Sequence, residues 1–451
     1  MSRELLLDAA SRGVRYVGGI DARSVAASPE AIACLAELDE PLPEAPASPE
    51  CVLEMLDRIG SPATTATTGR RFFGFVIGGA LPVTVAANWL AGAWDQPAGL
   101  VTVSPVGAAL EDVSLRWLVD LLGLPEGTGG AFVTGATMAN FTALAAARNA
   151  VFERAGWDVE ADGLQGAPQI TVVTGEEAHP SVLKSLGMLG LGRKRAVTVP
   201  VDRQGRMRAN VLPALNERTI VCVQVGNVNT GACDPIAEVC ALAHERGAWV
   251  HVDGAFGLWA AASSKLAHLV SGVEQADSWA TDAHKWLNVP YDSGVAFVRS
   301  TEHLQRAMSL TAAYLPQGAQ REPSQYTPEL SRRARGVEIW AALKTLGRTG
   351  VAHMIERNCR QAAMFAERLQ RAGCEILNDV VLNQVLVSFG DPDVTRRTIG
   401  LIQRDGACWC GETTWQGRVA MRISVCSWAT ADEDVERSLE AMLRCWDEAR
   451  R

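Results

Sequence analysis

Lysine is scarce in this sequence. The chain has 451 residues and 42 lysines and arginines, and only five of these cations are lysines, at positions 184, 194, 265, 285 and 344. Arginine stays protonated in proteins, so chemistry that needs a neutral side-chain amine is restricted to these five residues. The scarcity itself fits a compositional bias, and we assign it no function.

An excess of positive charge is also missing. Aspartate and glutamate number 51 against 42 lysines and arginines, which gives a formal net charge of -9. Proteins that bind nucleic acid usually carry a basic excess, so we expect no nucleic-acid partner. Hydrophobic residues (48%) and charged residues (21%) are close to ordinary globular values, which excludes disorder as the default state.

Cysteine pairs with metal-ligand spacing are absent. The eleven cysteines include no CxxC pair, and Cys408 and Cys410 have no second pair with which to complete a zinc site. We therefore expect no metal site, and reduced, mostly buried thiols in a cytoplasmic protein.

Long hydrophobic runs are few. The apolar run near the N-terminus stops after three residues, so we expect no signal peptide. Residues 72–94 are uncharged and long enough to span a bilayer, but they contain Pro82, Asn88 and four glycines. We expect no membrane segment, and we interpret this stretch as a buried strand, a glycine-rich turn and a core helix.

Short β-rich runs alternate with helical patterns in the middle of the chain. This alternation predicts an α/β domain with a mainly parallel sheet. Between two of the runs, Asp234 is expected to cap a helix that begins at Pro235. The predicted strands cover residues 170–173, 220–225, 249–252 and 294–298.

Changes of pattern predict three segments. Four prolines between residues 41 and 49 indicate an extended connector after an N-terminal helical region. Near residue 305 the pattern changes to a loop and then to a long helical region, from about 329 to 372. The predicted segments are a helical arm with its connector (1–65), a large α/β domain (66–305), and a mobile loop with a small C-terminal domain (306–451).

Lys285 has the most informative surroundings of the five lysines. Trp279 and Trp286 flank it, so its amine is expected to be partly desolvated, which favours the neutral form that an imine requires. Asp253 ends a predicted strand 32 residues upstream. Its carboxylate could cap the next segment, or it could hold a proton on the ring nitrogen of a pyridine cofactor.

Two other segments suggest ligand contacts. Residues 131–140 leave a strand through small residues and enter a helix, which frees backbone N–H groups for a phosphate. Their glycine pattern matches neither a Walker loop nor a dinucleotide fingerprint. His179 follows another predicted strand, although a lone histidine is more often structural than catalytic.

Together these motifs resemble the pyridoxal-phosphate-dependent group II amino-acid decarboxylases, over about residues 70 to 428. The resemblance is to the aromatic-L-amino-acid and glutamate decarboxylase group, of type I aspartate-aminotransferase fold. It implies a large domain at 66–305 with a mainly parallel seven-stranded sheet that binds pyridoxal 5′-phosphate, and a small C-terminal α/β domain. It also implies a homodimer.

The resemblance implies a role for each matching residue. Lys285 matches the Schiff-base lysine, and Asp253 matches the ring-nitrogen carboxylate. His179 matches the histidine that stacks on the ring, and Tyr314 matches a loop tyrosine that protonates the substrate carbon. The implied cofactor contacts are Gly135, Ala136, Thr137, His179, Asn227, Asp253, Ala255, Asp282, His284 and Lys285, and the implied substrate contacts are Phe75, Val76 and Arg422.

Several positions depart from the family pattern. They affect the implied phosphate contacts and the shape of the pocket more than the type of reaction. The departures are Ala136, Met138, Asn227, Gly254 and Ala283.

The implied activity is α-decarboxylation of an L-amino acid, which makes the chain a lyase of amino-acid metabolism. One alternative is an aldehyde synthase, whose carbanion meets oxygen; members of that type often replace the loop tyrosine with phenylalanine, so Tyr314 favours the decarboxylase. Other type I enzymes, such as retro-aldol lyases and aminotransferases, and a non-catalytic cofactor-binding relic also remain open. The sequence leaves the substrate amino acid undefined.

Overall fold

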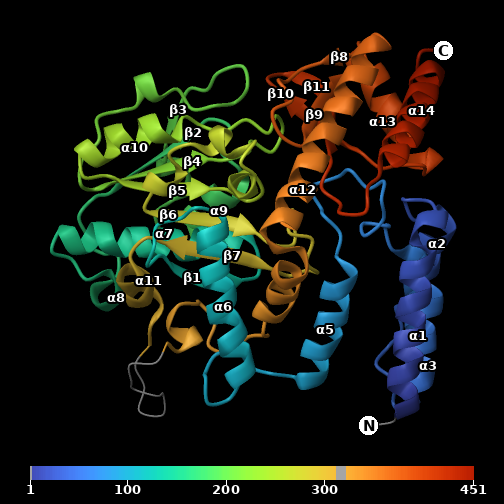
Figure 1. The fold of residues 1–451 in the computed structure, drawn as a ribbon, viewed down its shortest axis with the longest axis horizontal. Coiled ribbons are helices and arrows are strands. Elements are labelled where there is room, and N and C mark those ends of the chain that lie inside the picture. The colour runs from blue at the N-terminus through green and yellow to red at the C-terminus, as the bar shows by residue number, and fades with distance from the viewer. Residues whose placement is uncertain (1–2, 311–320) are drawn as a thin grey trace. The chain divides into compact units, whose positions relative to one another are not determined.

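The computed structural model describes residues 3–310 and 321–451 (Figure 1). The chain divides into two compact units, one formed by residues 80–360 and 378–384 and the other by residues 1–79, 361–377 and 385–451. The division into segments 1–65, 66–305 and 306–451 remains a prediction.

The first unit contains a seven-stranded sheet in the order β1-β7-β6-β5-β4-β2-β3. Neighbouring strands from β3 to β6 are parallel, whereas β7 is antiparallel to both β6 and β1. The predicted seven-stranded, mainly parallel α/β sheet is therefore confirmed. The strands are β1 (Gly129–Val133), β2 (Thr171–Gly175), β3 (Val197–Val199), β4 (Thr219–Gln224), β5 (Trp249–Asp253), β6 (Ser278–Asp282) and β7 (Gly294–Val298).

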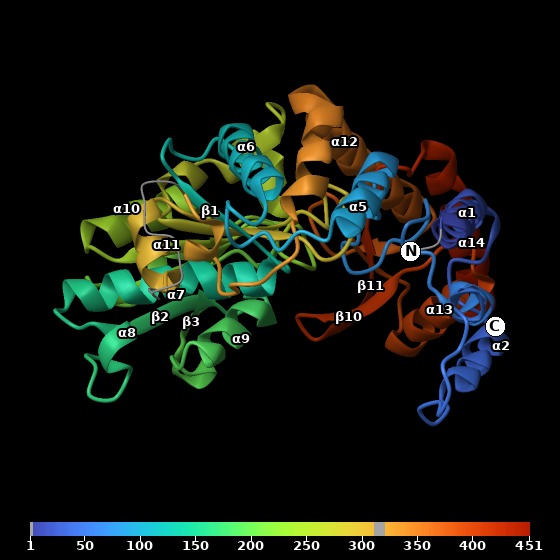
Figure 2. The ribbon, with the colours of Figure 1, turned by 90° about the horizontal axis from the view of Figure 1, so that it is seen from below.

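Helices cover this sheet. Every residue of β1, β5, β6 and β7 is buried, which explains why these strands read as continuous apolar runs. In Figure 2 strand β1 lies between α6 and α7. The α-helices of this unit are α5 (Pro82–Trp94), α6 (Pro105–Leu121), α7 (Ala136–Arg154), α8 (Val159–Asp162), α9 (Pro180–Met188), α10 (Ile236–Glu245), α11 (Thr301–Met308) and the first part of α12 (Gly336–Arg371).

Helix α7 packs along β5, β6 and β7. It is rich in alanine, and the small side chains let it approach the sheet closely; six of its alanines are at most 2% exposed. Its N-terminus follows β1 directly, so the packing of α7 fixes where its first backbone N–H groups point. Short 3-10 turns complete this unit at residues 193–195, 209–211, 257–262, 267–270, 273–275 and 323–325.

The second unit contains a four-stranded sheet in the order β10-β11-β9-β8 and an N-terminal helical region. Helix α13 packs against β11 and α14. The elements of this second unit are α1 (Arg3–Gly19), α2 (Pro29–Ala33), α3 (Pro49–Met55), α4 (Ser61–Ala63), the last part of α12, β8 (Glu375–Ile376), β9 (Gln384–Ser388), α13 (Pro392–Asp405), β10 (Gly411–Trp415), β11 (Arg418–Ser424) and α14 (Asp432–Ala449). It also has 3-10 or π turns at 20–22, 34–38 and 56–60.

Three local predictions were wrong. Phe72 forms a single bridge to Trp409 instead of starting a strand, and α5 exposes large side chains such as Trp89 and Leu90 instead of forming a core helix. Asp234 does not cap α10, because its two carboxylate oxygens accept from the backbone N–H groups of Met207 and Gln224, both at 2.7 Å. Pro235 takes the N-cap position and α10 begins at Ile236.

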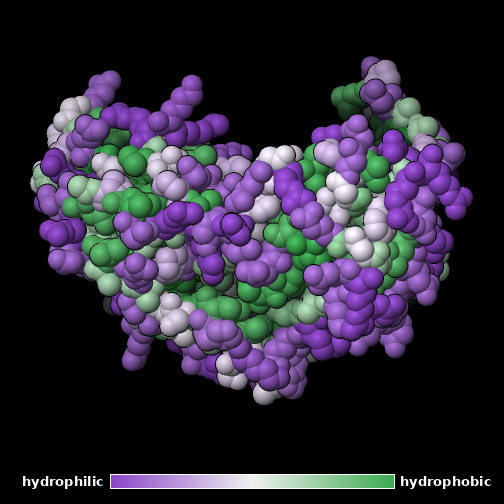
Figure 3. Space-filling view, turned by 90° about the horizontal axis from the view of Figure 1, so that it is seen from above, coloured by the Kyte–Doolittle hydropathy of each residue, from purple (hydrophilic) through white to green (hydrophobic). Residues whose placement is uncertain are grey.

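All eleven cysteines are free and seven of them are buried, as expected for reduced thiols. Within residues 3–310 and 321–451, no helix combines the length and hydrophobicity needed to cross a bilayer. On the face shown in Figure 3, apolar residues are visible among polar ones.

Candidate active site

The candidate site lies at the carboxyl-terminal edge of the seven-stranded sheet. Strands β2, β4, β5 and β6 run parallel, so their carboxyl ends meet at one edge, where open α/β sheets bind ligands. Asp253 ends β5 and Asp282 ends β6. The other predicted cofactor contacts lie on the loops and helix starts that follow the strands at this edge: Gly135, Ala136, Thr137, His179, Asn227, Ala255, His284 and Lys285.

Lys285 lies in the turn after β6. Its side chain is only 18% exposed, whereas the other four lysines are all exposed. Its Nζ lies 2.9 Å from Oδ2 of Asp282, a carboxylate that is itself buried. The expected burial of Lys285 is confirmed, and the structure adds a carboxylate partner that was not foreseen.

Asp253 is 3% exposed, and protein donors contact both of its oxygens. Oδ2 accepts from Nδ2 of Asn140 at 3.1 Å and lies 3.5 Å from Oγ of Ser181, and Oδ1 accepts from the backbone N–H of Ala255 at 3.2 Å. Among the described residues, no lysine, arginine or histidine forms an ion pair with Asp253. A buried carboxylate held only by neutral donors is suited to a cationic ligand group.

His179 directly precedes α9. Its Nδ1 accepts from the backbone N–H of Ser181 at 3.2 Å and lies 2.7 Å from Oγ of the same serine. Because a backbone N–H can only donate, Nδ1 is the unprotonated nitrogen of the neutral ring, and Nε2 carries the proton. Ser181 also contacts Asp253, so the two predicted residues share one neighbour.

The N-terminus of α7 can bind an anion. The backbone N–H of Ala136 donates to Oδ1 of Asp282 at 2.5 Å. The next two N–H groups, of Thr137 and Met138, have no acceptor among the described residues. A Cβ atom on Gly135 would lie 3.0 Å from the ring of His284, so glycine keeps this turn open. Free N–H groups at a helix start suit a phosphate.

His284 packs beside this turn. Burial lowers its pKa, so the ring is neutral at physiological pH. Its Nδ1 accepts from the backbone N–H of Ser293 at 3.1 Å, which leaves the proton on Nε2, 3.4 Å from Oδ1 of Asp282. The ring of Tyr291 stacks on it with centroids 4.2 Å apart.

Asn227 is buried and organises a turn. Its Oδ1 accepts from the backbone N–H groups of Asn229 and Thr230, at 2.9 and 3.2 Å. Only its Nδ2 therefore remains for a ligand among the described contacts. Ala255 contributes backbone contacts, since its carbonyl accepts from the N–H of Asp282 at 2.9 Å.

The sequence interpretation missed the residues behind Asp253. Nδ2 of Asn140 contacts Asp253, and Oδ1 of Asn140 lies 2.8 Å from Nε2 of His251. His251 lies two residues before Asp253 on β5, so both side chains point to the same face of the sheet. That spacing was the available signal for His251, but no sequence pattern indicated its contact with Asn140, 111 residues away.

The predicted substrate residues belong to the other unit. Phe75 is 60% exposed, and its ring lies tilted beside that of Trp409 with centroids 5.4 Å apart, whereas Val76 is 1% exposed. Arg422 lies on β11, where burial lowers its pKa. Tyr314, the predicted proton donor, lies outside the described residues.

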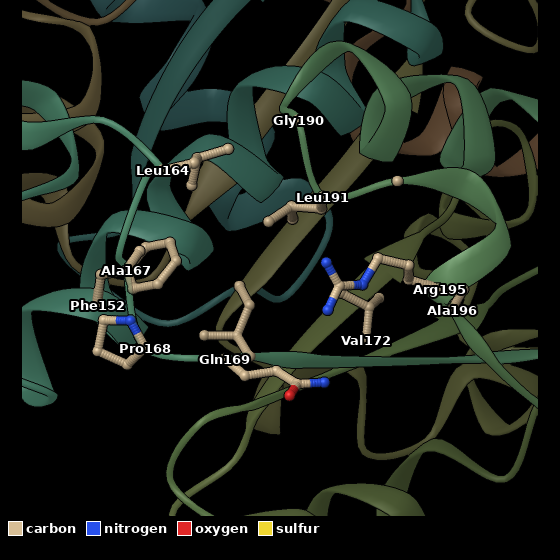
Figure 4. A pocket seen from close by; sticks show the side chains of 12 residues that line it. Phe152, Leu164, Ala167, Pro168, Gln169, Val172, Gly190, Leu191, Arg195 and Ala196 are labelled. Carbon is tan, nitrogen blue, oxygen red and sulfur yellow. The ribbon is translucent and has the colours of Figure 1, made fainter.

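A separate pocket of about 180 Å³ includes residues just before β2, at the opposite end of that strand from the candidate site (Figure 4). Phe152, Leu164 and Leu191 supply apolar surface, and Arg195 supplies a guanidinium. It contains none of the predicted site residues.

The arrangement suits one particular kind of ligand. Asp253 can pair with a protonated ring nitrogen, and the N–H groups of Thr137 and Met138 can bind a phosphate. Lys285 supplies an amine between these two contacts along the sheet edge. A pyridine ring that carries a phosphate and an aldehyde fits this donor set.

The comparisons with known proteins agree with this chemistry. Residues 32–390 match the family model described as the pyridoxal-dependent decarboxylase conserved domain. An aromatic-L-amino-acid decarboxylase of Bacillus atrophaeus is 29% identical, over 74% of this chain and 69% of that protein. An acidic amino acid decarboxylase of Bos taurus is 28% identical, over 69% of this chain and 62% of that protein.

Solved structures share the fold. The crystal structure of Oryza sativa TDC with PLP and tryptamine has a TM-score of 0.89 and 22% sequence identity, covering 99% of this chain and 97% of that one. The type I fold predicted from the motifs is confirmed. The chain therefore belongs to the pyridoxal-dependent decarboxylase family, and it is a carboxy-lyase of amino acids whose cofactor is pyridoxal 5′-phosphate.

Proposed function

We propose that this chain catalyses simple α-decarboxylation of an L-amino acid, releasing CO2 and a primary amine, with Lys285 as the residue that binds the cofactor covalently. One observation carries the proposal: a single sheet edge holds a buried carboxylate without a cationic partner, the least exposed lysine, and two backbone N–H groups without acceptors among the described residues.

Each residue has a role that follows from its chemistry. When bound, pyridoxal 5′-phosphate supplies an electron sink for the bond that breaks at the substrate Cα. Asp253 holds the proton on the ring nitrogen. The N–H groups of Thr137 and Met138 would bind the phosphate, and the absence of a Cβ at Gly135 keeps the turn clear of the His284 ring.

Lys285 and His179 complete the proposed machinery. Asp282 holds the Lys285 amine near the turn proposed to bind the phosphate. With the cofactor bound, the imidazole of His179 would cover one face of the ring and help to exclude water. Its Nε2 proton faces away from Ser181, where it can assist proton delivery to the substrate Cα.

Tyr314 is the proposed donor of that proton. A tyrosine at this position favours decarboxylation over aldehyde synthesis, because aldehyde synthases of the family often have phenylalanine there. We also propose Phe75, Val76 and Arg422 as substrate contacts, with Arg422 binding a carboxylate. The large apolar side chains exposed on α5, including Trp89 and Leu90, support the proposal of a homodimer.

The experiment is a product assay on the purified holoenzyme with a panel of L-amino acids. The panel includes aromatic and acidic amino acids, since relatives of both kinds match the chain. We expect CO2 and amine in equal amounts for one class, without peroxide or ammonia. Peroxide and ammonia in amounts equal to CO2 would instead establish the aldehyde synthase, and no CO2 from any amino acid would indicate the relic.

A further inference from the structure

A continuous chain of hydrogen bonds runs behind Asp253. Nε1 of Trp249 lies 2.9 Å from Oγ of Ser278, which lies 2.9 Å from Nδ1 of His251. Nε2 of His251 lies 2.8 Å from Oδ1 of Asn140, whose Nδ2 lies 3.1 Å from Oδ2 of Asp253. Side chains of β5, β6 and α7 thus converge on the predicted ring-nitrogen carboxylate.

The first and last side chains of this hydrogen-bond network fix which group donates and which accepts at each step. The indole of Trp249 can only donate, and the carboxylate of Asp253 can only accept. Asn140 must therefore turn its amide nitrogen toward Asp253 and its carbonyl oxygen toward His251. Nε2 of His251 must then carry the proton, and Nδ1 accepts from the hydroxyl of Ser278.

Both amide hydrogens of Asn140 are used. Its second amide hydrogen points to Oγ of Ser181 at 3.2 Å, and that serine contacts Nδ1 of His179 at 2.7 Å. One amide therefore contacts the carboxylate at the ring nitrogen and, through Ser181, the histidine expected over the ring face.

The residues of this hydrogen-bond network are buried, and none of them carries a positive charge. Asn140, His251 and Ser278 are all 0% exposed. Burial lowers the pKa of His251 to about 3, so its ring is neutral at the pH at which an enzyme works. The carboxylate is thus held firmly by neutral donors, and its countercharge is left to the ligand.

We propose that Asn140 and His251 are positioning residues that orient the Asp253 carboxylate toward the ring nitrogen of the cofactor, with Asn140 also aligning His179 through Ser181. This inference rests on the proposed function, in which Asp253 pairs with that nitrogen. A purely structural alternative is that the network only satisfies buried polar groups.

The test compares His251→Leu with His251→Gln. Leucine removes the donor to Asn140, whereas the amide of glutamine can restore it. Asn140→Ala removes the amide that joins His251 to Asp253. The matched control is Thr142→Val, since Thr142 is equally buried on α7 and its Oγ1 has no hydrogen-bond partner among the described residues.

Three properties are measured on each holoenzyme: the dissociation constant of pyridoxal 5′-phosphate, the kinetic constants, and the midpoint of the pH titration of visible cofactor absorbance. We expect His251→Leu and Asn140→Ala to weaken cofactor binding about tenfold. Their kcat should fall by a similar factor while KM stays within about twofold. The absorbance midpoint should move, and His251→Gln should recover most of each change.

Either of two results would overturn the proposal. The first is that His251→Leu and Asn140→Ala have the same cofactor affinity, kcat and absorbance midpoint as Thr142→Val. The other is His251→Gln behaving like His251→Leu at the same thermal stability. If His251→Leu does not fold, Asn140→Ala decides by the same comparison with Thr142→Val. Cofactor affinity is measured without substrate, so a wild-type enzyme that binds the cofactor but releases no CO2 contradicts the proposed function alone.

Discussion

Nζ of Lys285 lies 2.9 Å from Oδ2 of Asp282, and the other oxygen of that carboxylate accepts from the backbone N–H of Ala136 at 2.5 Å. A single buried side chain thus connects the candidate covalent lysine to the start of α7. The amine is held beside the turn proposed to bind the phosphate.

The first prediction concerns this connection. Asp282→Asn keeps an oxygen that can accept from Ala136 but removes the charge that holds the lysine. We expect kcat to fall roughly tenfold to a hundredfold, because displacing a reacting group by about 1 Å can cost that much. Steady-state kinetics of the cofactor-saturated variant give the value, and an unchanged kcat would show that Asp282 does not position Lys285.

A second prediction separates Lys285 from the other lysines. Lys285→Ala should abolish covalent cofactor attachment and lower kcat/KM by more than about a thousandfold, since it removes a group that no neighbour can replace. Lys344→Ala, an exposed position on α12, is the control and should retain wild-type activity. Persistence of the visible band of the covalent cofactor in Lys285→Ala would refute the assignment.

The third prediction concerns a buried charge that lies outside the proposed chemistry. Glu111 on α6 is 1% exposed and accepts from both Arg321 and Arg332, and the side chain of Arg332 is also 1% exposed. Glu111→Gln leaves a buried guanidinium without its countercharge, which should cost about 3 kcal/mol of stability. Thermal and urea unfolding measure the loss.

The adjacent residue supplies the control. Asp112 pairs with Arg116 on the exposed side of the same helix. Asp112→Asn should change stability by less than about 1 kcal/mol, because exposed ion pairs contribute little. Equal effects of the two substitutions would contradict the assigned importance of the buried pair.

The fourth prediction follows from the neutral state of His251. Its folded-state pKa of about 3 lies below the ordinary value of 6.5, so the unfolded chain binds the extra proton first as the pH falls. The stability associated with neutral His251 is complete above about pH 6.5 and is lost progressively toward pH 3.

His251→Gln lacks this titration and provides the comparison. Between pH 7 and pH 5, wild type should lose about 2 kcal/mol of stability relative to the variant. Unfolding free energies of both proteins at the two pH values test this difference. Parallel pH dependences would mean that His251 is not held neutral in the folded protein.

Local sequence patterns predicted the strands of the sheet, but they did not predict the hydrogen-bond network behind Asp253. The strand predicted at 294–298 has the observed bounds, because five consecutive apolar or small residues are typical of a strand buried on both faces. The predicted strand ends likewise indicated that Asp253 and His179 lie at the sheet edge, whereas the role of Lys285 follows from the resemblance to the family motif.

Contacts between distant segments could not be predicted in this way. The bond from Asn140 to Asp253 joins residues 113 positions apart, and it depends on how α7 packs on β5. The failed capping role of Asp234 has the same origin, since its carboxylate bonds to Met207, 27 residues upstream. Such side chains follow tertiary contacts rather than local propensity.

The most direct test of the account is to locate the cofactor on the chain. Borohydride reduction of the purified holoenzyme fixes the covalent cofactor, and peptide mapping by mass spectrometry then identifies the modified residue. We predict one modified site, Lys285, in stoichiometric amount. Modification of any of the other four lysines instead, or reduced holoenzyme without modified lysine, would contradict the central claim.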